Sequence, residues 1–269
     1  MAALVEETIM PPAGTFQEEG VAGIDITKGI KELTRLLSEL DDIGCEKTKI
    51  DDAFLAKCLR HRKGDYDRCL EVISNFLRFR RELGWPYVLS SEDVHPGALR
   101  SGFLWLLEDK FRRATLVYNF DCLDPLTTSV LEYQKMGMYL MELATDKLRN
   151  QEMGVVLVFD CRRLRMSHCT SFTLDDARRG AQMWQDAFPC RLARILIIGL
   201  STVCSSFVSL GLRTLPAKLR NRVSFLSTEE LASELGPETL PLDLGGTLPF
   251  DWAAKVDAHI SQSQEPFLE

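Results

Sequence analysis

The sequence lacks the long apolar runs that cross a bilayer. Its longest apolar stretches, such as Val155 to Phe159 and Ile195 to Ile198, are four or five residues long, whereas a membrane-spanning helix needs roughly 20. The N-terminus also lacks the basic region and apolar segment of a secretory signal, because Glu6 and Glu7 stand there instead. These absences predict a soluble, cytoplasmic protein.

Motifs for metals and nucleotides are missing as well. Histidine is scarce, with four in 269 residues, and the eight cysteines are scattered with no Cys-x-x-Cys pair, so we expect no zinc site. Scattered cysteines in a cytoplasmic protein are expected to be reduced thiols that fill the core. No glycine-rich loop lies between an expected strand and helix, which argues against a phosphate-cradling site. We therefore expect neither a metal nor a cofactor.

Three segments resemble catalytic groups, and each has a simpler structural interpretation. The stretch from Gly199 to Val203 has the strand, turn and helix of a nucleophile elbow but lacks its closing glycine. Ser167, His168 and Cys169 are neighbours in sequence, so their side chains point in different directions and do not form a triad. Asp160 and the pair Asp175-Asp176 suit turns and helix caps. The sequence thus favours binding over enzymatic turnover.

Charge is distributed unevenly. The net charge of -7 argues against nucleic acid as a partner, yet no acidic residue occurs between Asp186 and Glu229. The basic residues of this segment are Arg191, Arg194, Arg213, Lys218, Arg220 and Arg222. The segment is either an ordinary solvated face or a patch that binds anions or faces a membrane.

The N-terminal part predicts helices. Residues 1–23 show no sustained period and are expected to be a mobile arm. Apolar residues from Ile26 to Leu40 then recur every three or four positions, which is typical of an amphipathic helix. Phe54 to Leu59 and Leu70 to Leu77 suggest two more helices. Residues 24–88 therefore predict an all-helical region.

The pattern changes after residue 114 to short apolar runs that alternate with helical segments. Strands are expected at 115–120, 155–160, 193–199 and 222–226, with helices at 126–150, 173–187 and 203–215 between them. Strands joined by helical crossovers pair in parallel and are buried on both faces. The sequence therefore predicts an α/β fold for residues 89–260, followed by a tail at 261–269.

Two apolar features suggest what is bound. Six of the eight methionines lie between Met136 and Met183, and methionine suits a cavity that adapts to a flexible ligand, although such a cluster is also typical of a core. The stretch from Val203 to Leu210 is apolar with small hydroxyl residues and is flanked by cations. A helix of this kind is suited to lie on an anionic membrane surface.

Several motifs follow one another in a fixed order over about residues 30–260. The N-terminal motifs are Phe54 to Arg62, Asp65 to Arg68 and Phe76 to Arg80. The later motifs are Val156 to Asp160, Met166 to His168, Asp186 to Pro189, Ile195 to Gly199 and the Leu-Pro-x-x-x-Gly-Gly motif from Leu240 to Gly246. Together they resemble the CRAL-TRIO family of lipid-binding proteins, most closely its tocopherol-transfer and retinaldehyde-binding branch.

This resemblance implies an N-terminal helical region and an α/β sandwich with a mostly parallel sheet, a deep apolar pocket and a mobile helical gate. It implies one hydrophobic ligand that is tocopherol-like, retinoid-like or another isoprenoid. The matching gate is Val203 to Leu215. The implied ligand-binding residues are Gly137, Met138, Met141, Phe159, Leu164, Met183, Phe188, Ile195, Phe207, Val208, Leu210 and Leu212.

The resemblance also implies contact with phosphoinositide head groups through basic residues near the gate. The matching residues are Arg191, Arg194, Lys218, Arg220 and Arg222. The function expected is a cytoplasmic, monomeric carrier that associates transiently with phosphoinositide-containing membranes. The alternative is a CRAL-TRIO module that acts mainly in protein interaction or in phosphatidylinositol exchange.

Overall fold

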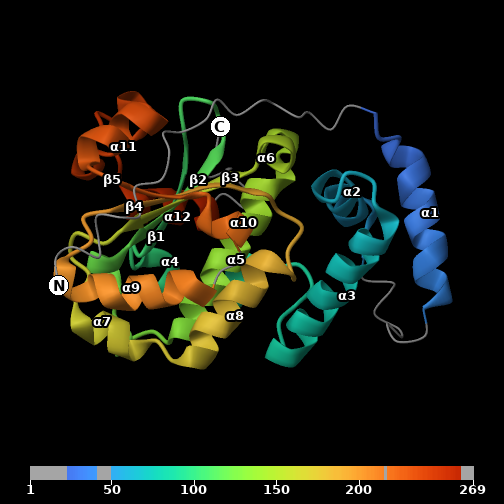
Figure 1. The fold of residues 1–269 in the computed structure, drawn as a ribbon, viewed down its shortest axis with the longest axis horizontal. Coiled ribbons are helices and arrows are strands. Elements are labelled where there is room, and N and C mark those ends of the chain that lie inside the picture. The colour runs from blue at the N-terminus through green and yellow to red at the C-terminus, as the bar shows by residue number, and fades with distance from the viewer. Residues whose placement is uncertain (1–22, 41–49, 215–216, 262–269) are drawn as a thin grey trace.

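A computed structural model describes residues 23–40, 50–214 and 217–261. The expected arm at 1–23 and tail at 261–269 lie almost entirely outside these ranges. The described chain opens with three helices, α1 (Ile26–Glu39), α2 (Asp52–His61) and α3 (Tyr66–Leu83). Figure 1 shows them together at one end of the molecule, which confirms the expected all-helical N-terminal region.

An aspartate precedes each of these helices. The side chains of Asp25, Asp51 and Asp65 each accept a hydrogen bond from the backbone N–H three residues further on. Each bond satisfies one of the free donors of a first helical turn. At the other end of α3, Gly84 adopts a left-handed φ of 65° and its N–H caps the helix. Local sequence therefore sets the ends of these helices.

The α/β part contains a five-stranded sheet in the order β1-β2-β3-β4-β5. The strands are β1 (Leu104–Glu108), β2 (Ala114–Asn119), β3 (Val155–Asp160), β4 (Leu192–Ile198) and β5 (Val223–Leu226). The four later strands pair in parallel, and β1 pairs with β2 in antiparallel fashion. The predicted α/β class with a mostly parallel sheet is confirmed, although the sequence did not lead us to expect β1.

Helices connect and cover the strands. They are α4 (Pro96–Arg100), α5 (Val130–Asp146), α6 (Leu148–Met153), α7 (Met166–Ser171), α8 (Leu174–Gln185), α9 (Thr202–Thr214), α10 (Ala217–Arg220), α11 (Thr228–Leu235) and α12 (Trp252–Ser261). Single 3-10 turns occur at Ser91–Asp93, Phe120–Cys122, Pro237–Thr239 and Leu242–Leu244. In Figure 1, α7, α8 and α9 lie on one side of the sheet and α11 on the other. The crossover expected at 126–150 is two helices, because Lys147 has extended backbone angles.

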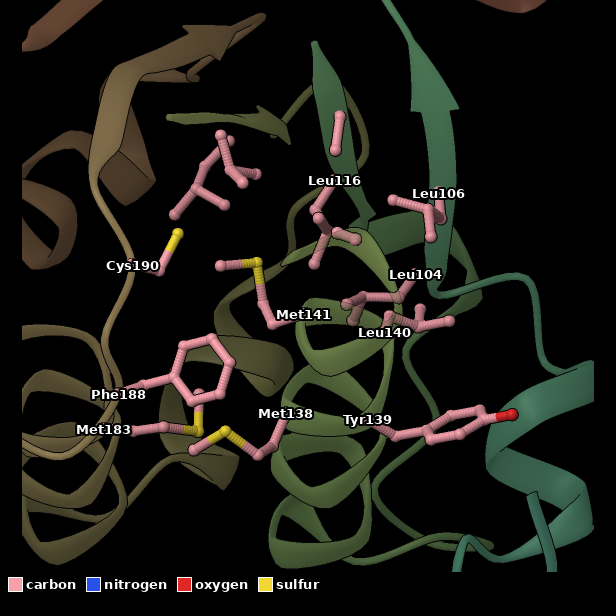
Figure 2. Close-up of a cluster of buried hydrophobic side chains, with 14 of the residues drawn as sticks. Leu104, Leu106, Leu116, Met138, Tyr139, Leu140, Met141, Met183, Phe188 and Cys190 are labelled. Atoms are coloured by element: carbon pink, nitrogen blue, oxygen red, sulfur yellow. The ribbon is translucent and has the colours of Figure 1, made fainter. Parts of the chain in front are cut away.

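The main core lies where α5 packs on the sheet. Met138 and Met141 of α5 are completely buried. In Figure 2, Met138 points toward Met183 and Phe188, while Tyr139 points away to the other side of α5. The methionines therefore fill the irregular space between α5, α8 and the segment before β4, which a flexible unbranched side chain does well.

A buried ion pair joins the N-terminal helices to this core. The Arg80 guanidinium of α3 is fully buried and donates through Nη2 to Glu142 Oε1 on α5. The second Glu142 oxygen accepts from the N–H of Leu89 at 2.8 Å. At the surface, Lys57 pairs with Asp146 at 2.7 Å. These contacts hold the helical region against α5.

The Leu-Pro-x-x-x-Gly-Gly motif closes a tight loop beside the sheet. The N–H of Gly246 donates to Pro241 O at 3.0 Å, and that of Leu248 donates to Leu240 O at 2.9 Å. A Cβ at Gly246 would lie 1.9 Å from Leu240 O. Only glycine fits where two backbones approach so closely.

Candidate functional site

A cavity of about 370 Å³ lies between the sheet and helices α5, α8, α9 and α10. Its lining consists of Phe103, Tyr118, Phe120, Val130, Tyr133, Gln134, Gly137, Leu157, Phe159, Cys161, Leu164, Phe172, Asp176, Gly180, Met183, Trp184, Leu192, Ile195, Ile197, Val208, Gly211, Leu212 and Leu219. Most of these side chains are apolar or aromatic. Protein interiors normally leave few voids larger than a water molecule. A space of this volume and character therefore marks a candidate ligand site.

The floor of the cavity follows from strand geometry. Leu157 and Phe159 of β3 both line it, as do Ile195 and Ile197 of β4. Residues two apart on a strand share one face of the sheet. Tyr118 of β2 continues the floor, since it pairs with Phe159 in the parallel register. Alternate residues of three neighbouring strands thus form one apolar surface.

Aromatic rings form one end of the cavity. Tyr118 stacks on Phe159 with ring centroids 4.7 Å apart and an interplanar angle of 13°. Phe103 meets Tyr118 edge-on at 5.8 Å and Phe120 at 5.7 Å. Offset stacking and edge contacts are favourable arrangements for aromatic pairs. This cluster makes a well-packed inner wall.

Helix α9 covers the cavity. Val208, Gly211 and Leu212 line it from this helix. Val203 and Leu210 face outward instead, with 68% and 58% of their surface exposed. The exposed Val203 and Leu210 give the outer surface of α9 an apolar character that is suited to contact with a membrane interface.

The structure brings seven of the twelve expected ligand-binding residues to the cavity. They are Gly137, Phe159, Leu164, Met183, Ile195, Val208 and Leu212. Met138, Met141 and Phe188 lie in the core instead, and Leu210 faces solvent. The side chain of Phe207 lies outside what the structure describes. That these residues bind a ligand stays a prediction.

The sequence did not single out the aromatic end of the cavity. Phe103, Tyr118, Phe120 and Tyr133 all line it. The two-residue period of a strand could have identified part of this end. It places Leu157 and Phe159 on one face of the sheet, and Tyr118 lies beside Phe159 in the parallel register. Phe103 directly precedes β1, and the sequence analysis placed no strand in that segment.

Most polar groups of the lining are engaged by the protein itself. The Gln134 amide donates to Asp176 O at 2.8 Å and accepts from Arg179 at 3.0 Å. Asp176 pairs with Arg179 at 2.8 Å and completes the capping box of α8 with Thr173. The Tyr133 hydroxyl accepts from the N–H of Asp124 at 3.3 Å. These groups stabilise the wall rather than reach freely into the cavity.

The residues considered for catalysis also have structural partners. Asp160 accepts hydrogen bonds from the N–H and the guanidinium of Arg162, the shortest 2.7 Å long. The Nδ1 atom of His168 accepts from the N–H of Arg165 at 3.3 Å. Burial raises the pKa of the neighbouring Cys169 thiol to about 11, so this thiol is a poor nucleophile at neutral pH. The turn and cap interpretation fits these contacts.

A group of cations lies near α10, and we call Arg62, Arg68, Arg191, Lys218 and Arg222 the basic cluster. Burial and then the charges of the other four members lower the pKa of Lys218. Burial and Arg191 lower the pKa of Arg222, whose guanidinium donates to Leu192 O. Within the described residues, no carboxylate pairs with Arg62, Arg191, Lys218 or Arg222. Arg68 pairs with Asp65 at 3.7 Å, so the positive charge that lacks a carboxylate partner among the described residues belongs to the other four members.

His61 lies beside this cluster. Both of its ring nitrogens are buried and have no hydrogen-bond partner among the described residues. Burial, followed by the charges of Arg62, Lys218 and Arg222, lowers the pKa of His61 to about 3. The imidazole is neutral at physiological pH because burial, and then the cations around it, disfavour its charged form.

The other two residues expected to contact phosphoinositides lie differently. Arg194 donates to Glu234 at 2.8 Å and to Ser224 at 3.5 Å, so its charge is compensated. Arg220 is exposed at the end of α10. Arg62 and Arg68, which the sequence did not suggest, belong to the cluster because the end of α2 and the start of α3 lie near α10.

Comparisons with known proteins agree with this architecture. A family model described as the CRAL/TRIO domain matches residues 100–246. A mouse (Mus musculus) protein named alpha-tocopherol transfer protein-like is 29% identical over 231 residues, which cover 82% of this chain and 66% of that protein. Its human (Homo sapiens) namesake is 28% identical over 278 residues, covering 100% of this chain and 78% of that protein.

Two further comparisons extend the range. The human protein named tyrosine-protein phosphatase non-receptor type 9 is 27% identical over 221 residues, which cover 79% of this chain and 36% of that protein. The crystal structure of Sfh5 superposes with a TM-score of 0.60 at 14% identity, covering 90% of this chain and all of that one. That likeness concerns the fold. Among the described residues, no helix has both the length and the apolar character to cross a membrane.

Proposed function

The chain belongs to the CRAL/TRIO domain family, and from this premise we propose that it is a lipid-binding and lipid-transfer protein without enzymatic activity. It holds one hydrophobic molecule, tocopherol-like, retinoid-like or another isoprenoid, beneath α9. The observation that carries this proposal is the apolar cavity of about 370 Å³. The names of its alpha-tocopherol transfer protein-like relatives support the same class of ligand.

Helix α9 acts as the gate in this proposal. Its inner residues Val208 and Leu212 close the cavity, while Val203 and Leu210 are exposed to solvent. Opening exposes further apolar surface, which water disfavours and a membrane interface accepts. A membrane that favours the open state shifts the population toward it. Exchange of the ligand then takes place at the membrane surface.

The basic cluster selects the membrane in this proposal. Phosphoinositide head groups carry several phosphates, and clustered arginine and lysine side chains bind such groups through charge-assisted hydrogen bonds. Lys218 and Arg222 lie near the C-terminal end of α9, so head-group contacts there are close to the gate. We propose that the protein acts as a monomer in the cytoplasm and associates transiently with phosphoinositide-containing membranes.

The carrier proposal is tested by identifying what the protein holds. The chain is purified from a lipid-rich cell extract, and its mass under native conditions is compared with its denatured mass. We expect one stoichiometric hydrophobic molecule, which organic extraction releases for identification. An empty but folded protein that captures no lipid would contradict the proposal and favour an interaction module.

The membrane proposal is tested with the double variant Lys218→Ala/Arg222→Ala. Each basic residue near an anionic surface contributes about 1 kcal/mol, so the variant is expected to bind phosphoinositide vesicles about 30-fold more weakly. The matched control is Lys28→Ala/Lys31→Ala, which removes the same charge from exposed positions of α1. Equal binding by both variants would refute a role for the basic cluster.

A further inference from the structure

The cavity contains a free hydroxyl at its inner end. The Tyr118 side chain lies among Phe103, Phe159 and Gly137, and a Cβ at Gly137 would stand 3.6 Å from the Tyr118 oxygen. Burial raises the pKa of Tyr118, and no charge or hydrogen bond contributes to the shift. No described residue donates a hydrogen bond to this hydroxyl or accepts one from it. Tyr118 is half-buried, and its hydroxyl is not among the fully buried atoms that lack a partner. The hydroxyl therefore remains accessible from the cavity, where a bound molecule can supply its hydrogen bond.

The charge of the lining limits what that partner is. Among the described residues that line the cavity, none is cationic, and the carboxylate of Asp176 is already paired with Arg179. Burying an ionised group without a counter-charge is strongly unfavourable. An anionic carboxylate or phosphate is therefore disfavoured inside the cavity, whereas a neutral oxygen forms a hydrogen bond with Tyr118 at little electrostatic cost.

The extent of the cavity limits how a ligand lies in it. The cavity extends from Tyr118 on β2 across β3 to Ile195 on β4 and Leu219 on α10. A lipid with one terminal oxygen matches this extent, since the oxygen meets Tyr118 and the apolar tail lies over β3 and β4.

We infer that the Tyr118 hydroxyl is the specificity determinant of the cavity, and that it selects a neutral lipid with an alcohol or carbonyl oxygen, bound oxygen-first. This inference rests on the proposed carrier function and adds to it the chemical class and the orientation of the ligand. Tyr118 is a binding residue in this role. Gly137 assists because the absence of a side chain leaves the hydroxyl accessible.

The test uses three probes that share one chain: dodecanol, dodecane and laurate. Partition of each probe from neutral phosphatidylcholine vesicles onto the wild-type protein is compared with partition onto Tyr118→Phe. The variant keeps the ring and its stacking on Phe159 and removes only the hydroxyl. A lost hydrogen bond to a neutral partner weakens binding by about fivefold to tenfold. We expect that loss for dodecanol and no change for dodecane.

Two further variants strengthen the design. Gly137→Ala places a methyl group in ordinary contact with the Tyr118 hydroxyl and is expected to reduce the preference for dodecanol over dodecane. Tyr139→Phe is the matched control, because Tyr139 lies on α5 outside the cavity lining and bonds to His259. It is expected to leave the ratio of the two affinities unchanged.

The outcomes separate this inference from the carrier proposal. Wild-type protein that binds dodecanol and dodecane equally, with no effect of Tyr118→Phe, overturns the role of the hydroxyl and leaves the apolar carrier in place. Laurate bound more tightly than dodecanol at neutral pH overturns the selection for a neutral oxygen. Wild-type protein that binds none of the three probes overturns the inference, and the carrier proposal falls with it only if organic extraction also releases no hydrophobic molecule.

Discussion

Replacing Glu142 with leucine is expected to destabilise the protein by about 3–5 kcal/mol, because it removes the carboxylate that pairs directly with the buried Arg80 guanidinium. Arg80 is completely buried, and its Nε and Nη1 atoms have no hydrogen-bond partner among the described residues. Burial lowers the pKa of Arg80 to about 10, and the negative charge of Asp93 opposes this shift. The variant also removes the acceptor of the Leu89 N–H.

The double variant Arg80→Met/Glu142→Leu provides the comparison. Replacing a whole buried ion pair with apolar side chains is often neutral or stabilising by roughly 1–4 kcal/mol. The two introduced side chains would pack near Phe76 and Trp85, whose rings lie 5.0 Å and 5.9 Å from the Arg80 guanidinium. We therefore expect the double variant to recover most of the stability that Glu142→Leu loses.

Urea unfolding followed by near-ultraviolet circular dichroism measures both variants, and thermal unfolding provides a second measure. For a chain of this length, the single substitution is expected to lower the Tm by on the order of 10 °C. A loss below about 1 kcal/mol, or a double variant as unstable as Glu142→Leu, would refute the view that an uncompensated charge causes the effect.

Two further predictions concern pH and backbone geometry. The pKa of His61 is lowered from 6.5 to about 3 in the folded protein, so the unfolded chain takes up the proton first and stability falls as pH drops below 6.5. Between pH 7.5 and 5, His61 lowers the free energy of unfolding by about 2 kcal/mol at most. The free energy of unfolding of His61→Gln, measured with denaturant, should therefore depend less on pH than that of wild type. An identical dependence would exclude His61 as the cause. Gly246→Ala places a methyl group 1.9 Å from Leu240 O. Its free energy of unfolding, measured with denaturant and followed by circular dichroism, should therefore be lower than that of wild type by several kcal/mol. Gly180→Ala, whose new atom meets Gln134 at an ordinary 3.5 Å, is the control, and equal stability of the two variants would contradict the close-approach explanation.

The sequence predicted much of the α/β framework because parallel strands are continuous apolar runs. Strands β2, β3 and β4 begin and end within one residue of the expected positions. β1 was not predicted although Phe103 to Leu107 is an apolar run of five residues, because an antiparallel edge strand lies outside the pattern of parallel strands joined by helical crossovers. The break between α5 and α6 was also missed, since the backbone angles of Lys147 depend on packing rather than on its side chain.

The candidate site shows where sequence patterns end. A helical period identifies the apolar positions of α5, but it does not show which of them face a cavity. Met138 and Met141 were expected to bind the ligand and lie in the core, whereas Gly137 lines the cavity. The basic cluster joins Arg62 to Lys218 and Arg222, which are more than 150 residues away in the chain. Arg194 belongs to the same basic stretch, yet its side chain turns to Glu234.

The sequence by itself determined the fold class, the helix caps and the family motifs, because hydrophobic period, capping aspartates and obligatory glycines act over a few residues. Tertiary structure decided which apolar residues leave a cavity, which cations remain uncompensated, and that the Tyr118 hydroxyl has no partner among the described residues. These properties depend on how side chains from distant segments fill space and pair charge around one another, and no spacing along the chain specifies that.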